Sequence, residues 1–403
     1  MNQRVPFIKK LQLLMVGLWI KWLNFWILFF QKLFFCQKAS NPQNILIYKI
    51  GNIGDIVCAV PSFIAIRRFY PNAKITILTS PGVKSAPGAR ELLTGAWYFN
   101  EMKIYYADEI DSLSKKINFI KDLRGNNYDL FIQIPDDLAN FKTLFRNMIF
   151  AKFIGVKSAF GFKIRTIQLF KKTQVDYLFK KNEVENLIEI LKENEVDCKN
   201  IEFSFNIDVN KKIKIDNILT KNFGLDYKKK LIIAISPAGK REANKWPIER
   251  YKELVAYIKK KYGVKFVVIG GQTEFTDAEI IKSGISNGIL NLAGELDLLE
   301  NLELLKRCSF LVSNDTGTAH MAAAVGLSVV GIYGVRNVFG SWFPYGKNHK
   351  ILYHKFIDCD YQREECIKKS VELITFNEAA RACDDIIEEL NKNYHGLQRK
   401  ILR

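Results

Sequence analysis

The sequence lacks the patterns that would assign a class of protein at once. Its seven cysteines include no CxxC pair and their number is odd, so neither a disulfide scaffold nor a zinc ribbon is indicated. No RNA-binding motif, basic helix or zinc finger is visible, and nucleic acid is therefore not expected as a partner. No short internal repeat or low-complexity tract occurs either, and most of the chain is expected to fold as a globule.

Metal ligands are equally sparse. Cys359, Cys366 and Cys383 are the one group of cysteines that could share a metal ion or a disulfide. Asp358 and Asp360 flank Cys359 in a formal DxD sequence, a pattern that holds a nucleotide-bound divalent ion in some enzymes. This pattern lies late in the chain and not at the end of a core strand. We therefore predict no metal site and no cofactor.

Positive charge is what the sequence has in excess. Lysine and arginine number 60 against 42 aspartates and glutamates, which gives a formal net charge of +18. Such an excess suits an anionic membrane surface or an acidic substrate, although a biased genomic base composition would produce it as well. With 403 residues, the chain is long enough for two domains and an additional segment.

That additional segment is residues 1–40. Leu11 to Phe35 is dense in large apolar groups, but lysines interrupt it, and no run reaches the ~18–20 apolar residues of a spanning helix. Lys10, Lys21 and Lys32 are spaced by about three helical turns and stack on one face. We therefore predict an amphipathic helix in a membrane interface. A tilted spanning helix is the alternative, and a signal peptide is disfavoured because no convincing cleavage site follows.

After residue 40 the chain alternates between strands and helices, which implies two doubly wound parallel α/β sheets. The expected division is a Rossmann-like domain at 41–205, a linker at 206–228, a second Rossmann-like domain at 229–373, and a C-terminal helix with a basic tail at 374–403. Two such domains facing one another would place a ligand cleft at the carboxyl ends of both sheets.

Residues 310–326 are the most informative of these βα units. Asp315, Thr316 and Thr318 are candidate N-cap residues between a buried strand and an alanine-rich helix. Gly317 permits another group to approach the backbone closely. The unpaired amides and the dipole of such a helix favour a phosphate, whereas the alternative is an ordinary capped helix.

A second loop carries an acid. The sequence Gly51-Asn-Ile-Gly54 is followed by Asp55 and is neither a GxGxxG sequence nor a P-loop. A carboxylate at this loop–helix junction would repel a pyrophosphate, which argues against nucleotide binding in the first half. Asp55 is either a plain helix cap or a general base that takes a proton from a hydroxyl.

Cations gather in the loop after the first strand of the second half. Lys240, Arg241 and Lys245 lie there within six residues of one another. They could balance a diphosphate and stabilise it as it leaves, unless the loop is a solvated surface of a lysine-rich protein. Gly270 and Gly271 form a further loop at the same expected sheet edge.

Together these loops resemble glycosyltransferase family 9, which contains the lipopolysaccharide heptosyltransferases. The likeness runs from about residue 44 to the end of the chain and rests on the order and spacing of its motifs. These are Gly54-Asp55 with Pro61, Lys245-Trp-Pro247, Gly270-Gly271 with Glu274, Asn314-Asp-Thr-Gly-Thr-Ala-His320 and Trp342-Phe-Pro-Tyr-Gly346. The resemblance implies a GT-B fold, with the acceptor on the first domain and the nucleotide-sugar donor on the second, and an inverting, metal-independent transfer.

The resemblance also implies roles for individual residues. Asp55 matches the proposed catalytic base, with Gly51 and Gly54 on the acceptor side. The phosphate-binding lysine of the family usually stands two residues before the Trp-Pro pair, where this chain has Asn244, so Lys245, Lys240 or Arg241 would take over that contact. The implied donor site comprises Asp315, Thr316, Gly317, Thr318, His320, Gly270, Gly271, Glu300, Lys240 and Arg241, with Glu300 near the ribose.

The function expected from these features is transfer of a heptose or related sugar from a nucleotide-sugar, ADP-heptose being favoured, to a lipopolysaccharide core or a similar anionic glycolipid. The expected location is the cytoplasmic face of the inner membrane, held peripherally or by the N-terminal segment. Two alternatives use the same architecture: a nucleotide-sugar epimerase or hydrolase, and a non-catalytic membrane-bound glycan-binding protein.

Overall fold

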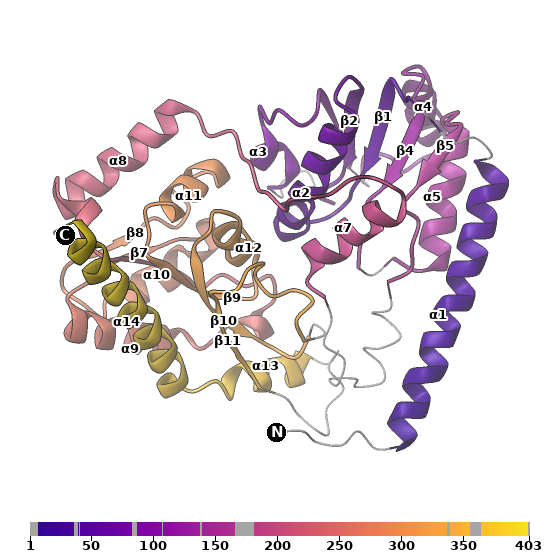
Figure 1. Cartoon of the computed structure of the whole chain (residues 1–403). Helices are drawn as coiled ribbons and strands as arrows, with labels where there is room; N and C mark the ends of the chain where they lie inside the picture. Colours follow the sequence, from indigo (N-terminus) through magenta and orange to yellow (C-terminus); the bar gives the residue numbers. More distant parts are fainter. Residues whose placement is uncertain are drawn as a thin grey trace. The chain divides into compact units, whose positions relative to one another are not determined.

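The computed structural model describes residues 7–35, 39, 41–82, 87–106, 108–137, 139–165, 181–336, 339–354 and 364–401. The chain divides into two compact units. The first contains Met1–Asn206 and Val338–Trp342, and the second contains Ile207–Asn337 and Phe343–Arg403. Each unit has its own parallel sheet covered by helices on both faces (Figure 1).

The sheet of the first unit has the strand order β3-β2-β1-β4-β5, and all its pairs are parallel. Strands β4 and β5 are buried throughout and β1 and β2 are buried after their first residue, as expected for a parallel sheet between two layers of helices, whereas the edge strand β3 is half-buried. The strands are β1 (Asn44–Tyr48), β2 (Lys74–Thr79), β3 (Glu101–Ile104), β4 (Leu130–Gln133) and β5 (Ser158–Phe160). After the N-terminal helix, the helices of this unit include α2 (Ile53–Phe69), α3 (Ala89–Leu93), α4 (Leu113–Arg124), α5 (Phe141–Phe153) and α7 (Glu183–Glu193).

Helix α1 (Phe7–Phe34) belongs to the first unit and lies beside α5 (Figure 1). Phe30 of α1 packs edge-on against Phe145 of α5 with ring centroids 4.9 Å apart, and Ile27 is fully buried. By length and composition, Leu14–Phe34 is apolar enough to cross a membrane. Within the N-terminal segment, Phe7–Phe34 is therefore one helix with a face fixed to the first unit.

The sheet of the second unit has the order β11-β10-β9-β6-β7-β8, again with parallel pairs throughout. Its strands are β6 (Ile232–Ser236), β7 (Lys265–Val268), β8 (Ile289–Asn291), β9 (Phe310–Asn314), β10 (Ser328–Tyr333) and β11 (Lys350–Tyr353). Its helices are α8 (Val209–Phe223), α9 (Ile248–Tyr262), α10 (Phe275–Lys282), α11 (Leu298–Leu305), α12 (Gly317–Ala324), α13 (Glu364–Glu372) and α14 (Phe376–Ile401), with short 3-10 turns at Tyr227–Lys229, Glu242–Asn244 and Gln272–Glu274.

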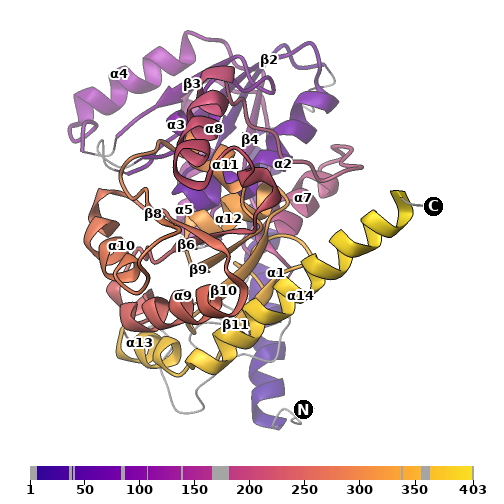
Figure 2. The same cartoon turned by 90° about the vertical axis from the view of Figure 1, so that its left-hand side faces the viewer.

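Two boundaries differ from the expected division. Residues 206–228 were expected to be a linker, but most of them form α8, which packs on α11 of the second unit. The reason is an apolar stripe of Ile215, Leu219 and Phe223 that is buried there. The C-terminal helix α14 continues to Ile401, so it includes most of the expected basic tail, and it lies along α9 and β11 (Figure 2).

Candidate active site

In parallel α/β sheets, ligands bind outside the carboxyl ends of the strands, at the point where the strand order reverses. In the first unit this point lies between β1 and β4, since β2 and β3 are on the other side of β1. The helix start after β1 carries Asp55, and the turn after β4 carries Asp136 and Asp137. Three carboxyl groups therefore gather at the reversal of the first sheet.

Asp55 lies in the first turn of α2 and is half-buried. Its Oδ2 accepts a hydrogen bond from the backbone N–H of Asn52 at 2.9 Å. Gly51 leaves room for it, because a Cβ at Gly51 would lie 2.3 Å from the Cβ of Asp55. Within the described residues, no hydrogen bond is made to Oδ1. The cap and the base are therefore compatible roles, since one oxygen orients the carboxylate and the other can take a proton. Gly54 lies in the same first turn of α2.

A buried ionic pair in the first unit was not expected from the sequence. Arg165 donates to both carboxylate oxygens of Glu183, at 2.6 and 3.0 Å, and also to the carbonyl of Pro135 at 2.8 Å. The side chains of Arg165 and Glu183 are only 8% and 1% exposed. No local pattern could reveal this pair, because the two residues come from different segments that only the fold brings together.

Lys49 was also missed. It directly follows β1, is fully buried, and its Nζ has no hydrogen-bond partner within the described part of the chain. A charged residue immediately after an apolar strand was the available signal. Burial raises the pKa of the Cys58 thiol on α2, Glu183 and Asp55 raise it further, and Lys49 opposes them. Asp55 and Lys49 therefore both lie close enough to Cys58 to affect the pKa of its thiol.

Asp137 is held in a turn. Asp137 precedes helix α5, which begins at Phe141 because Asn140 is its N-cap and accepts from the N–H of Thr143 at 3.0 Å. The indole Nε1 of Trp342 donates to Oδ2 of Asp137 at 2.9 Å. Burial raises the pKa of Asp137 to about 7, with a smaller rise from Asp136 and an opposing effect of the Trp342 hydrogen bond.

Replacing Asp137 by Asn is expected to flatten the pH dependence of stability between about pH 4 and 7. The pKa of Asp137 is about 7 in the folded protein, above the ~3.9 of an unfolded aspartate. The folded state therefore has its full stability at this site while Asp137 is protonated, below about pH 4, and loses it as the pH rises through 7. At about 1.4 kcal/mol for each pKa unit, the wild-type protein loses roughly 4 kcal/mol. Urea unfolding at several pH values measures the slope, with Asp122→Asn on the exposed face of α4 as the control. An unchanged slope in Asp137→Asn would contradict the assignment.

In the second unit the strand order reverses between β6 and β9. Asn314 at the end of β9 is fully buried and joins the two loops there. Its Nδ2 donates to the carbonyls of Pro237 and Ala238 at 2.7 and 3.1 Å. Its Oδ1 accepts from the N–H of Trp246 at 3.1 Å and from the hydroxyl of Tyr251 at 2.9 Å. The cationic loop is thereby held against the start of α12.

Lys245 is the half-buried cation of this loop. A Cβ at Gly239 would lie 2.8 Å from its Cγ, so the stem of Lys245 rests directly on the loop backbone. Its ammonium pairs with Glu242 at 3.1 Å and with Asp277 at 3.7 Å. Burial by itself would lower the pKa of Lys245, but the hydrogen bond to Glu242 and the two carboxylates raise it overall. Lys245 is therefore a fixed positive charge at the reversal of the second sheet.

The neighbouring polar residues differ from Lys245 in exposure. Lys240 and Arg241 are exposed, and Arg241 pairs with Glu364 at 3.1 Å. Asn244, which occupies the position where the family usually has its lysine, is buried in the loop. Of the three predicted cations, Lys245 is thus the one held by packing.

Helix α12 begins at Gly317 with Thr316 as its N-cap residue. The hydroxyl of Thr316 lies 3.2 Å from that of Ser313 on β9, and Asp315 and Thr318 are half-buried beside it. The first backbone amides of the helix therefore lie at the carboxyl edge of β9, next to the Lys245 loop. Such an end favours an anionic ligand.

His320 lies in the first turn of α12 and is buried. Burial, with a smaller contribution from the nearby His349, lowers the pKa of His320 to about 4. His320 is therefore a neutral imidazole near pH 7 and adds no positive charge to the site.

Two residues predicted to bind the nucleotide-sugar, Gly271 and Glu300, make hydrogen bonds within the protein. The N–H of Gly271 donates to the carboxylate of Glu274 at 2.9 Å, in the loop after β7 that begins at Gly270. Glu300 accepts from the N–H of Asp297 at 3.0 Å, and both of its oxygens lie 2.9 Å from the ammonium of Lys214 on α8. A ribose hydroxyl at Glu300 would have to share the carboxylate with Lys214.

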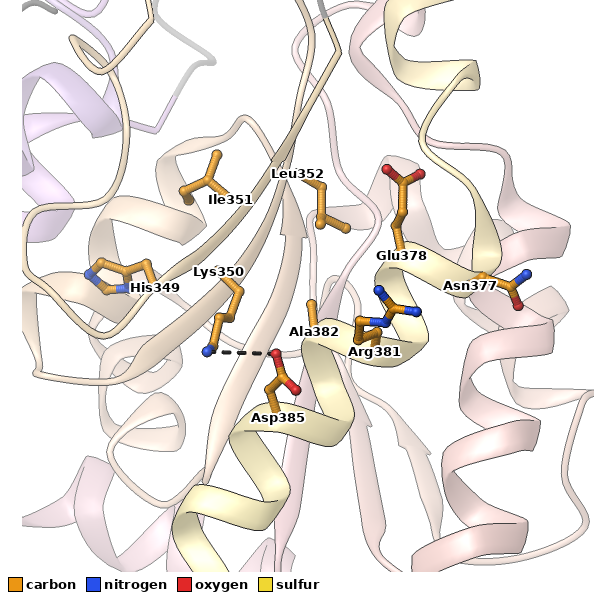
Figure 3. A pocket seen from close by; sticks show the side chains of 9 residues that line it. All are labelled: His349, Lys350, Ile351, Leu352, Asn377, Glu378, Arg381, Ala382 and Asp385. Carbon is orange, nitrogen blue, oxygen red and sulfur yellow. Dashed lines mark ion pairs between the residues drawn. The ribbon is translucent and has the colours of Figure 1, made fainter. Parts of the chain in front are cut away.

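The pocket in Figure 3 contains none of the predicted site residues. It lies between β11 and α14, where Lys350 and Asp385 form an ion pair at 3.8 Å. The site loops instead follow β6, β7 and β9, on the inner strands of the sheet.

No group of three or more metal-ligating side chains occurs in the described ranges. Cys58, Cys198, Cys308 and Cys383 form no disulfide, whereas Cys366 is disulfide-bonded. Because Cys383 is buried and free, it shares no disulfide with the other two cysteines of the expected group. The DxD sequence, with Asp358, Cys359 and Asp360, lies outside the described residues.

Two parallel α/β units, each with polar loops at the reversal of its sheet, define a GT-B fold, and solved structures agree. A family 9 glycosyl transferase from Veillonella parvula superposes with a TM-score of 0.69 at 16% identity, over 88% of this chain and 99% of that one. The ADP-heptose lps heptosyltransferase II of E. coli superposes with a TM-score of 0.62 at 19% identity, over 86% and 99%.

The chain belongs to glycosyltransferase family 9 (heptosyltransferase), whose sequence model matches residues 117–371, more than half of the chain. Lipooligosaccharide heptosyltransferase 2 of Haemophilus ducreyi is 33% identical over 98 residues, which are 23% of this chain. The matched stretch covers 28% of that relative.

Proposed function

We propose that the protein is an inverting, metal-independent glycosyltransferase that moves a heptose from a nucleotide-sugar, ADP-heptose in the first instance, to a lipopolysaccharide core or a similar glycolipid. The observation that carries the proposal is the contrast between the two sheet reversals. The first presents a carboxylate, Asp55, whereas the second presents the ammonium of Lys245 beside the amide end of α12. Names of relatives that include heptosyltransferase, lipooligosaccharide and ADP-heptose support the choice of sugar, donor and acceptor.

In the proposed reaction Asp55 takes the proton of an acceptor hydroxyl. The oxygen of that hydroxyl attacks the anomeric carbon from the side opposite the diphosphate, and the bond from this carbon to the phosphate oxygen breaks. Inversion follows from this single displacement. The leaving nucleoside diphosphate gains negative charge, which Lys245 and the first amides of α12 would stabilise. Because these groups supply positive charge, the proposal requires no metal ion.

The acceptor would be anionic and membrane-bound. A net charge of +18 favours binding to a phosphorylated or carboxylated glycolipid at the cytoplasmic face of the inner membrane. In this scheme the first unit binds the acceptor and the second unit binds the nucleotide-sugar donor, which is the division that the resemblance to the family implies.

A transfer assay tests the proposal. The purified full-length chain is incubated with ADP-heptose or other nucleotide-sugars and with defined truncated glycolipids, and products are read by mass spectrometry. We expect a mass gain of one heptose on a glycolipid, unaffected by a metal chelator. Release of free sugar or of an epimer from the donor alone would favour a hydrolase or epimerase. No mass gain with any heptose donor would sink the proposed function.

A further inference from the structure

Helix α1 has one face that packs on the first unit. Ile20 and Ile27 are buried on this face. Between them, the side chain of Asn24 accepts from the N–H of Ile164 at 2.8 Å and donates to its carbonyl at 3.1 Å. Further along, the ammonium of Lys152 on α5 donates to the carbonyl of Phe34 at 2.8 Å. The helix is therefore fixed along its length from about residue 20 to its end.

The opposite face of α1 exposes large apolar side chains in an unbroken stripe. Each of them has between 47% and 63% of its surface exposed, and they are Leu11, Leu14, Met15, Leu18, Trp19, Trp22, Phe25, Leu28, Phe29 and Leu33. Soluble monomers rarely expose a contiguous apolar patch of this kind. Exposed Lys21 and Lys32 lie among these groups, and Trp19 stacks on Trp22 with centroids 4.8 Å apart.

We propose that this apolar face of α1 seats the first unit on the surface of an anionic bilayer, with the helix lying in the interface and not crossing it. Tryptophans and lysines interleaved with large apolar groups are the composition of an interfacial helix: the rings and stems enter the headgroup layer while the ammonium groups reach anionic phosphates.

A crossing orientation conflicts with the packing of α1. Although Leu14–Phe34 is apolar enough to span, lipid would then have to surround it. The contact of Asn24 would instead carry the segment at Ile164 into the hydrocarbon. The packing of α1 on α5, with the bond from Lys152 to Phe34, would carry α5 there as well, together with its exposed Lys142, Arg146 and Lys152. Charged side chains in the bilayer core are costly, whereas an interfacial helix leaves all of them in water.

The direction of α1 relative to the sheet brings the membrane contact close to the acceptor edge of the first unit, where the assignment of that edge rests on the proposed function. Asn24 contacts Ile164, beyond the carboxyl end of β5, whereas the N–H of Ala39 contacts the Ser158 hydroxyl at the start of β5. The helix thus runs opposite to the strands, and its first turns extend past the sheet edge that carries Asp55. The membrane contact and the acceptor edge of the first unit are therefore adjacent.

Vesicle sedimentation of the purified full-length chain tests the membrane contact without any donor. We expect binding to vesicles of phosphatidylcholine mixed with phosphatidylglycerol, and weaker binding to phosphatidylcholine alone or at high salt. Leu18→Glu, Phe25→Glu and Phe29→Glu are each expected to lower the partition coefficient by about tenfold or more, because each withdraws a large apolar side chain from the interface. Leu113→Glu is the matched control, since Leu113 on α4 of the same unit is 75% exposed but lies off the stripe.

Three results would overturn the inference. Equal vesicle binding by a Leu18→Glu/Phe25→Glu/Phe29→Glu variant would remove the stripe as the contact. Resistance of the cellular protein to alkaline carbonate extraction, with an N-terminal tag protected from protease added on the cytoplasmic side, would show a spanning helix. Absence of vesicle binding, with a dimer in sedimentation velocity that the same substitutions dissociate, would show that a second copy covers the stripe. Failure of the transfer assay would leave the vesicle results unaffected.

Discussion

Replacing Asp55 by Asn is expected to lower kcat for sugar transfer by about 10²–10⁴-fold, because the amide cannot take the proton of the acceptor hydroxyl. The structural cost is small, since the Asn side chain keeps an oxygen that can accept the N–H of Asn52. Donor affinity is expected to stay unchanged, because Lys245 and α12 belong to the other unit. Steady-state kinetics for both substrates and thermal unfolding of the variant provide the measurements.

Two further variants separate chemistry from helix capping. Asp122→Asn removes a carboxylate on α4 that is 63% exposed, and is expected to leave kcat unchanged. Gly51→Ala keeps Asp55 but forces it to move, because the new Cβ would lie 2.3 Å from the Cβ of Asp55, and kcat is expected to fall. If Asp55→Asn retains the wild-type kcat, Asp55 is only a helix cap and another group must be the base.

Replacing Arg165 by Met is expected to destabilise the first unit by about 3–5 kcal/mol, because it leaves the Glu183 carboxylate buried without its partner. The two side chains are 8% and 1% exposed, so water cannot replace the lost hydrogen bonds. The double variant Arg165→Met/Glu183→Leu is expected to recover most of this loss, since no charge then remains buried. Denaturant unfolding of the wild type, both single variants and the double variant gives the coupling free energy.

The exposed pair Arg68 and Glu202 serves as the matched control. It has a similar separation, 2.7 Å, but its side chains are 47% and 45% exposed. Arg68→Met is expected to cost less than about 1 kcal/mol, because solvent screens the pair. A loss of the same small size in Arg165→Met would show that the buried pair contributes little to the stability of the first unit.

The sheets were predictable because their signals are local. The apolar run from Asn44 to Tyr48, and the turn residues around it, predict a buried strand whatever the rest of the chain does. The same holds for Phe310–Asn314 and the helix start after it. The segment 206–228, predicted as a linker, was predicted less well because polar residues dominate it. Its three apolar residues, Ile215, Leu219 and Phe223, become a buried stripe only because α8 packs on α11.

The site shows the same division. Asp55, Lys245 and Thr316 lie in the segments that follow β1, β6 and β9. Because the carboxyl ends of parallel strands meet at one edge of a sheet, the sequence by itself determined which residues are candidates. Asn314 fixes the cationic loop through four hydrogen bonds to residues far away in the chain, and only the fold reveals them. Lys245, in turn, is distinguished from Lys240 and Arg241 by its burial against Gly239.

The sequence alone determined the two-unit α/β architecture, the family and the amphipathic character of residues 7–34, because periodicity, motif spacing and composition are local properties. Only the tertiary structure decided which face of α1 is exposed, because the opposite face packs on the first unit through contacts such as that of Asn24 with Ile164. It likewise decided the raised pKa of Asp137 and the pairing of Arg165 with Glu183. Burial and long-range contacts set those properties, and neither can be predicted from residues that are adjacent in the sequence.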